Sequence, residues 1–135
     1  LTSDNPSEAP EWIELGLRAA ITRDACAMIE SLYNDRTLFP DDTSIQQGEV
    51  RHKSRKLTLN TIFGKIKLTR NYFHHSPSKT GRFPLDEKLG LEGHYTPALA
   101  RLVCRAASMS ASFSQGAEDL AIFAGIKVCP RQFGR

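Results

Sequence analysis

The chain has 135 residues, of which 40% are hydrophobic and 24% charged, and 18 Lys and Arg against 15 Asp and Glu give a formal net charge of +3. This is ordinary globular composition for one modest domain with little room for a large catalytic cleft, so a binding module is favoured over an enzyme. No stretch approaches the roughly 18 to 20 apolar residues of a membrane-spanning helix, and nothing at the N-terminus resembles a signal peptide.

The number and spacing of the cysteines indicate the redox compartment in which the protein works. Cys26, Cys104 and Cys129 are odd in number and far apart in the chain, which suggests neither a disulfide framework nor a four-thiolate zinc site. A reducing compartment fits best, and we expect a cytoplasmic protein that has no membrane segment. Because the chain begins at Leu1 and stops inside a predicted helix, we also expect it to be a piece of a longer gene product.

The first predicted element is an amphipathic helix from Pro10 to about Asn34, because apolar residues recur there at steps of three and four. The early acids Glu8, Glu11 and Glu14 suit the positive end of its dipole. Two interpretations of its apolar residues remain open: pairing with a second copy of the chain, which would make a homodimer, or packing on its own domain. With the polar segment that follows, it forms the first predicted unit, residues 1–45.

The second predicted unit, residues 46–95, begins with a β-hairpin. Apolar and polar residues alternate in 56–62 and 65–72, which is typical of strands, and Phe63-Gly64 is the predicted turn. One face is expected to present Leu57, Leu59, Ile66 and Leu68 to a core. The other face is expected to present Lys56, Lys65, Lys67 and Asn60 or Thr69 to solvent. A two-stranded basic ribbon has about the width that the major groove of DNA admits, although lysines also serve to protect hairpin edges.

Charge is unevenly distributed, and the hairpin carries most of the excess of bases. Residues 1–42 hold nine acids and three bases, whereas the remaining 93 residues hold 15 bases and six acids. A basic block attracts a polyanion through counterion release, and nucleic acid is the commonest polyanion in a cytoplasm; a solvated basic surface is the alternative. Seven bases without an intervening acid are expected to contact phosphates: Arg51, Lys53, Arg55, Lys56, Lys65, Lys67 and Arg70.

The connection after the hairpin is rich in turn residues and contains His74 and His75. A zinc site built from these two histidines and distant cysteines is the weaker interpretation, and surface histidines in a loop are the stronger one. We therefore expect no metal and no cofactor in this chain. A small enzyme that uses the two histidines is the least favoured function.

The third predicted unit, residues 96–135, is helical. Thr96 and Pro97 suit the start of a helix that extends to about Ser110. Ser114 is expected to cap a second helix, in which Ala117, Leu120, Ala121 and Phe123 face inward. Gly125 then provides a turn, and Pro130 opens a third helix.

This order of helix, turn and helix fits a helix-turn-helix that is truncated inside its recognition helix, although a generic helical pair shows the same spacing. Arg is suited to guanine and Gln to adenine. Four further residues are therefore expected to face DNA, the last three of them near base edges: Lys127, Arg131, Gln132 and Arg135.

The combined motifs resemble the N-terminal region of bacterial insertion-sequence transposases of the Kra type, whose catalytic domain is of the DDE, RNase H-like class. The resemblance extends from about Arg51 to the end of the chain. It rests on three runs: Leu57-Thr58-Leu59-x-Thr61-x-Phe63-Gly64, Arg70-x-Tyr72-Phe73, and Phe83-Pro84-Leu85-Asp86-x-x-Leu89-Gly90-Leu91 with Tyr95-x-Pro97. The family typically has a Cys-x-x-Cys knuckle after the hairpin, where this chain has His75 and Ser78.

The resemblance implies that a missing C-terminal part would hold the catalytic carboxylates and their metals. Within this chain no such constellation is found, since Asp86-Glu87 and Glu118-Asp119 are adjacent pairs with ordinary roles near a turn or on a solvated helix. We therefore expect an α+β module that binds double-stranded DNA at the ends of a mobile element, associated with the nucleoid. The alternative is a transposase-derived remnant that acts as a protein-interaction or regulatory module without catalysis.

Overall fold

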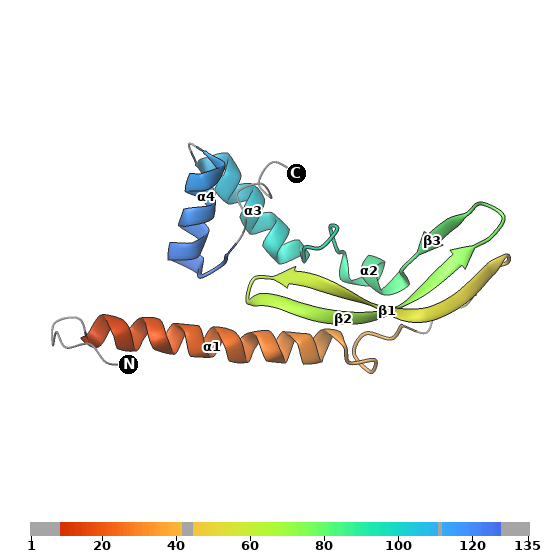
Figure 1. The fold of residues 1–135 in the computed structure, drawn as a ribbon, viewed down its shortest axis with the longest axis horizontal. Coiled ribbons are helices and arrows are strands. Elements are labelled where there is room, and N and C mark those ends of the chain that lie inside the picture. The colour runs from red at the N-terminus through yellow and green to blue at the C-terminus, as the bar shows by residue number, and fades with distance from the viewer. Residues whose placement is uncertain (1–8, 42–44, 111, 128–135) are drawn as a thin grey trace.

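The structure, a computed structural model, describes residues 9–41, 45–110 and 112–127 of the chain. It is an α+β fold, as predicted: a long N-terminal helix lies along an antiparallel sheet, and helices follow toward the C-terminus (Figure 1). The elements in chain order are α1 (Ala9–Tyr33), β1 (Glu49–Thr61), β2 (Gly64–His75), β3 (Thr80–Arg82), α2 (Pro84–Leu89), α3 (Pro97–Met109), α4 (Phe113–Asp119) and a short π-helix, η1 (Leu120–Ala124).

The sheet confirms the predicted hairpin and extends it. Both strands are longer than the alternation indicated, and β3 pairs with the far end of β2 in the order β1-β2-β3. The expected turn is wrong by one residue: Thr61 pairs with Gly64, so Ile62 and Phe63 form the loop. Gly64 is the first residue of β2, and its φ of 137° explains why glycine stands there.

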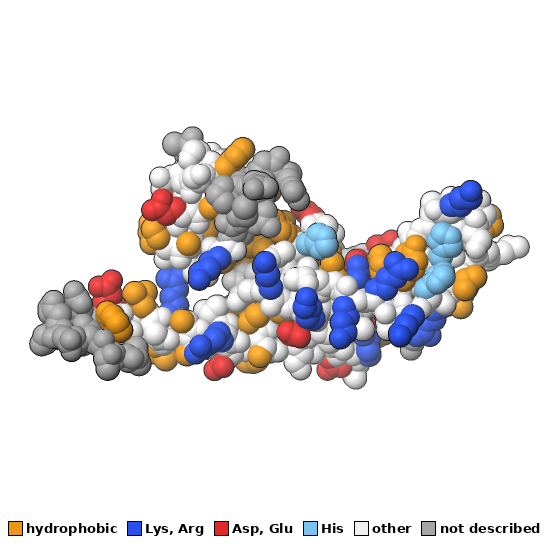
Figure 2. Space-filling model, viewed as in Figure 1, with side chains coloured by type: hydrophobic (Ala, Val, Ile, Leu, Met, Phe, Trp, Pro, Cys, Tyr) orange, Lys and Arg blue, Asp and Glu red, His pale blue; other side chains and the backbone are white. Residues whose placement is uncertain are grey.

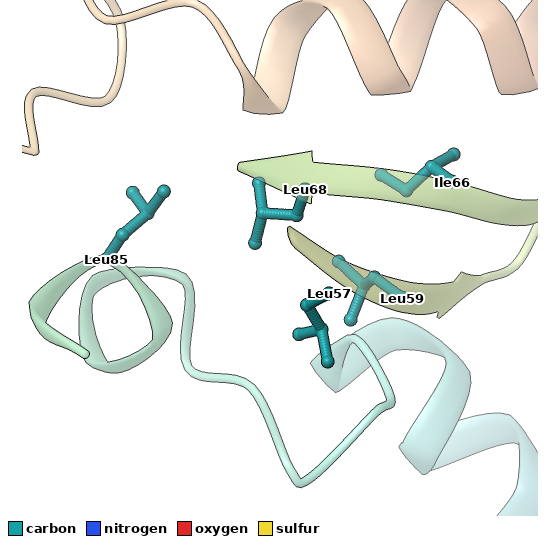
Figure 3. Close-up of a cluster of buried hydrophobic side chains, with 5 residues drawn as sticks. All are labelled: Leu57, Leu59, Ile66, Leu68 and Leu85. Atoms are coloured by element: carbon teal, nitrogen blue, oxygen red, sulfur yellow. The ribbon is translucent and has the colours of Figure 1, made fainter. Parts of the chain in front are cut away.

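The main core lies on the predicted face of the hairpin. Leu57 pairs with Leu68 and Leu59 with Ile66, and all four side chains are buried. Figure 3 shows them together with Leu85, which α2 contributes. Partly buried residues from α1, from the loop after it and from the end of α2 complete this cluster: Cys26, Ile29, Tyr33, Phe39, Leu89 and Leu91.

The chain after α1 covers the free edge of β2. The side-chain amide of Asn34 donates to the Lys67 carbonyl at 2.8 Å and accepts from the Thr69 amide at 2.9 Å. Arg36 donates to the Thr69 carbonyl, and Asp41 accepts from the Asn71 amide at 2.6 Å. Backbone groups that would otherwise be exposed at a strand edge therefore have partners until β3 begins.

The helical prediction for α1 is confirmed, and of the two interpretations of its apolar residues, packing on its own domain holds for part of the helix alone. None of its residues is buried, and only its C-terminal half reaches the core. Large apolar side chains remain exposed along it, because the sheet edge contacts only one side of the helix: Trp12, Ile13, Leu15, Leu17, Ile21, Met28 and Leu32. No helix in the described part of the chain is both long enough and apolar enough to cross a membrane.

The C-terminal helices form a second core around Leu99, Val103, Leu120 and Ile126, into which Ile62 of the hairpin loop packs. Thr96 caps α3 as predicted, accepting from the Leu99 amide. Two expectations are wrong. Ser112, not Ser114, caps α4, so the helix begins two residues earlier than a cap at Ser114 would allow. Ala121 and Phe123 are exposed rather than facing inward, Phe123 at 81%, since Leu120 and Ile126 fill the contact with α3.

Candidate nucleic-acid interface

The face of the hairpin opposite the core is basic and open. Strand alternation that points the leucines inward points Lys56, Lys65 and Lys67 outward, and all three are exposed. Cross-strand pairing sets Lys67 opposite Thr58, to whose hydroxyl it donates, and Lys65 opposite Asn60. Figure 2 shows Lys and Arg side chains spread along the length of the molecule over this sheet. We call Lys56, Lys65 and Lys67 the lysine face.

The far end of the hairpin adds further bases through an irregularity in β1. His52 pairs with Tyr72 and Arg55 with Arg70, so two residues of β1 stand opposite the single residue Asn71. Such a bulge increases twist and re-aims side chains. The predicted residues Arg51 and Lys53 are exposed here, as is the whole segment 50–56 of β1.

Arg55 is exposed but lies on the other side of the sheet from the lysine face, because it pairs with Arg70 in the same alternation as Leu57 with Leu68. Its guanidinium lies 4.2 Å from the ring centre of Tyr72, which in turn lies against Phe83 at 4.9 Å. Arg55 therefore combines a cation–π contact with access to solvent.

Arg70 does not belong to the interface, which corrects its predicted role as a phosphate contact. It is 8% exposed, and its Nε donates to Asp86 Oδ1 at 3.1 Å. Its guanidinium also stacks over Phe83, 3.9 Å from the ring centre. The reason is strand parity: Arg70 shares its face of β2 with Ile66 and Leu68.

An ion pair fixes the end of the sheet that lies farthest from the loop at 62–63. Arg82 of β3 donates to both carboxylate oxygens of Glu49 of β1, at 2.6 and 2.8 Å. These hydrogen bonds hold the pKa of Glu49 at about 2, well below its ordinary value of 4.5, and raise the pKa of Arg82. Glu49 is thus charged at neutral pH and joins the two outer strands across β2.

His74 and His75 are the last two residues of β2 and are half-buried, not surface residues of a loop as expected, because β2 continues far enough to pair with β3. The two side chains have different surroundings. His74 lies near Tyr72 and His52, with 5.9 Å between the two imidazole centres, whereas His75 Nδ1 is hydrogen bonded to Ser78, whose hydroxyl also contacts Thr80. His75 and Ser78 are the positions where the resemblance expects cysteines, and they do lie side by side. Within the described ranges, no three His, Cys, Asp or Glu side chains converge as metal ligands would.

The C-terminal helices α3, α4 and η1, which we call the helical unit, approach the hairpin near the loop between β1 and β2. Lys65 and the predicted Lys127 line one pocket of about 260 Å³, together with Gly125 at the end of η1. Lys65 and Lys127, which are 62 positions apart in the sequence, are thus brought to the same end of the lysine face. The other predicted residues of this unit, Arg131, Gln132 and Arg135, and the helix expected to open at Pro130, lie outside the described residues.

The motif residues behind the resemblance mostly hold the fold together. Leu85 is fully buried, Asp86 binds Arg70, and Gly90 ends α2 with a φ of 65°. Asp86 therefore has a more specific role than the turn or cap expected of it. Asn60 and Thr69 lie on the open face as predicted, whereas sequence reasoning missed Thr58 there, although the same alternation that identified the lysines points it outward.

Comparison with known proteins adds no relative: no family model matches the chain, and neither a curated protein nor a solved structure matches it.

Proposed function

We propose that this chain binds duplex DNA, and that the lysine face of the hairpin makes the central phosphate contacts. The observation that carries the proposal is the placement of Lys56, Lys65 and Lys67 on one solvent-exposed sheet face, in a stretch (51–70) that contains no acid. Neighbouring strands are about 4.8 Å apart and alternate residues about 7 Å apart, so these ammonium groups are spaced for several phosphates of one duplex.

The surrounding polar groups support a contact with nucleic acid. Thr58 and Asn60 stand between the lysines and offer hydroxyl and amide groups, which commonly bind phosphate or sugar oxygens. Arg51 and Lys53 extend the basic surface toward the far end, and Lys127 extends it toward the helical unit. In this proposal the hairpin positions the DNA, and the helical unit approaches it from the end where Lys65 and Lys127 meet.

The biological setting that we propose rests on the motif resemblance. The target would be the end of an insertion element, the location the nucleoid, and the chain the non-catalytic, DNA-binding part of a DDE-type transposase of the Kra type. A remnant that acts only through protein contacts is the second candidate, and the exposed apolar side chains of α1 favour it.

The experiment measures binding of the full chain to a fluorescent 25-mer duplex across a salt series. Lys56, Lys65 and Lys67 are changed to Ala together, and the control changes Arg23, Arg101 and Arg105 to Ala. These control residues are exposed on α1 and α3, so both variants lose the same net charge. If each lysine neutralises one phosphate, the slope of log K against log salt falls by about 2.7 in the first variant, since each contact contributes about 0.9.

The control variant should keep a slope close to that of the unchanged chain. Equal losses in the two variants would mean that net charge alone drives binding and would remove the lysine face as a site. A folded chain with no affinity for duplex DNA even at low salt would exclude the DNA proposal and leave the protein-contact candidate.

A further inference from the structure

The outer side of α1 carries an apolar stripe that no described part of the chain covers. Leu17, Ile21, Met28 and Leu32 are 59%, 58%, 64% and 43% exposed. At 3.6 residues per turn these four side chains fall within about 60° around the helix, turned away from the side that packs on the sheet. Figure 1 shows α1 along one border of the molecule, with the sheet and the other helices all on one side of it.

The spacing of the stripe is symmetric about the point between Asp24 and Ala25. Leu17 and Leu32 are equally far from this point, and so are Ile21 and Met28. If two copies of α1 pack antiparallel about a two-fold axis there, Leu17 faces the partner's Leu32 and Ile21 faces the partner's Met28. Self-complementarity of this kind is what an isologous contact requires, and an unrelated partner would have no need of it.

The exposed area is of the size that a weak dimer needs. The four side chains together expose on the order of 450 Å², so two copies bury about 900 Å² before flanking residues are counted, which approaches the lower range of specific interfaces. An apolar patch of this size is comparable with the largest ones on soluble monomers, which often serve in binding.

We propose that α1 pairs antiparallel with α1 of a second copy through Leu17, Ile21, Met28 and Leu32. This interaction surface is separate from the lysine face and does not depend on DNA binding. Since α1 lies alongside the hairpin, the two-fold axis makes the two hairpins of the dimer run in opposite directions (Figure 1).

The first test is sedimentation equilibrium of the full chain from about 1 to 300 μM, with far-UV circular dichroism to verify folding. Changing Ile21 and Met28 to Gln should raise the dimer dissociation constant at least about 10-fold, because two buried aliphatic side chains are lost at each symmetric contact. The control changes Leu15 and Ile45 to Gln. These two residues are 54% and 55% exposed and lie off the stripe, so the control should change the dimer dissociation constant less than about twofold.

Salt separates this pairing from a charge-driven one. The stripe is apolar, and the two Asp24 side chains approach each other near the axis, so added salt should strengthen association and Asp24→Asn should strengthen it about twofold. Association that weakens with salt would instead indicate the acidic helix of one copy on the basic hairpin of another, and would overturn the proposal.

Cross-linking tests the register. In a chain with Cys26, Cys104 and Cys129 changed to Ser, copies carrying Leu17→Cys should form a disulfide with copies carrying Leu32→Cys, and neither should link well to itself. Efficient linking among the Leu17→Cys copies alone would show a parallel pair. That result would overturn the proposal. So would a chain that stays monomeric at every concentration, or an equal loss of dimer affinity in the stripe and control variants.

Discussion

Arginines that look alike in the sequence have different roles in the structure, and strand parity decides between them. Arg51 and Arg70 both belong to the acid-free basic block, but Arg51 is exposed whereas Arg70 is buried against Asp86 and Phe83. A buried charge is tolerated only with a partner, since the cost of removing it from water must be offset by pairing and hydrogen bonds. Arg70 is therefore part of the core of the fold.

We predict that Arg70→Ala lowers the free energy of unfolding by about 2 to 4 kcal/mol, because it leaves the Asp86 carboxylate without its partner and empties the space over Phe83. Urea denaturation at pH 7 measures the change. Arg51→Ala serves as the control and should cost less than about 0.5 kcal/mol, since Arg51 is exposed. In the folded state Arg70→Ala should leave the salt slope of DNA binding unaltered; a slope reduced by about 0.9 would restore the phosphate role.

At the residue scale the sequence predicts well wherever one local rule decides. Thr96 with Pro97 marks a helix start, and the alternation around Leu59 identifies the core face, because caps and pleats depend on immediate neighbours. The same alternation, applied to Arg70, would have placed it inside. What the sequence could not reveal is that Asp86 lies next to Arg70, since this contact depends on how α2 folds back over the sheet.

At the scale of elements, the two edges of the hairpin are treated differently. Asn34, Arg36 and Asp41 cover β2 with side-chain hydrogen bonds. On β1, Asn60 exchanges backbone hydrogen bonds with the segment at 94–96. Open edges invite pairing with other chains, and charged side chains discourage it, so the bases along β1 also protect that edge.

We predict that Asn34→Ala destabilises the fold by about 1 to 3 kcal/mol, because the Thr69 amide and the Lys67 carbonyl lose their partners at the edge of β2. Hydrogen exchange followed by NMR should show the Thr69 amide exchanging faster than in the unchanged chain. Ser31→Ala, an exposed position on α1, is the control and should leave this amide unaltered. Unchanged protection of Thr69 in Asn34→Ala would mean that the edge is held by other contacts.

The order and type of elements followed from periodicity, but their packing did not. The helix at 9–33 and the hairpin were predicted, whereas the bulge at 53–54 and the strand at 80–82 were not, since both arise from pairing across the sheet. For α1, periodicity indicated an apolar side without indicating what would cover it. The sheet edge reaches only residues near Cys26, Ile29 and Tyr33, and the remaining apolar side chains stay exposed.

At the scale of the whole molecule, two cores share the hairpin. Leu57, Leu59, Ile66, Leu68 and Leu85 form the first, and the second belongs to the helical unit, with Ile62 of the hairpin loop packed into it. A long-range hydrogen bond adds to this link: Arg18 of α1 donates to the Ile122 carbonyl at 3.1 Å near the C-terminal end of η1. A cation there is favourable, since carbonyls at a helix end lack partners within the helix.

The division into two cores predicts that the helical unit can unfold while the hairpin stays folded. Leu99 and Leu59 are both almost fully buried, and each change to Ala should cost about 2 to 4 kcal/mol in its own core. Because the second core is smaller and reaches the hairpin mainly through Ile62 and Asn60, Leu99→Ala should speed hydrogen exchange in α3 and α4 while β1 and β2 keep their protection. Leu59→Ala should speed exchange in both units, since the helical unit rests on the hairpin. Equal loss of protection throughout the chain in Leu99→Ala would show instead that the two cores unfold as one, and that the helical unit cannot yield locally while the lysine face remains in place.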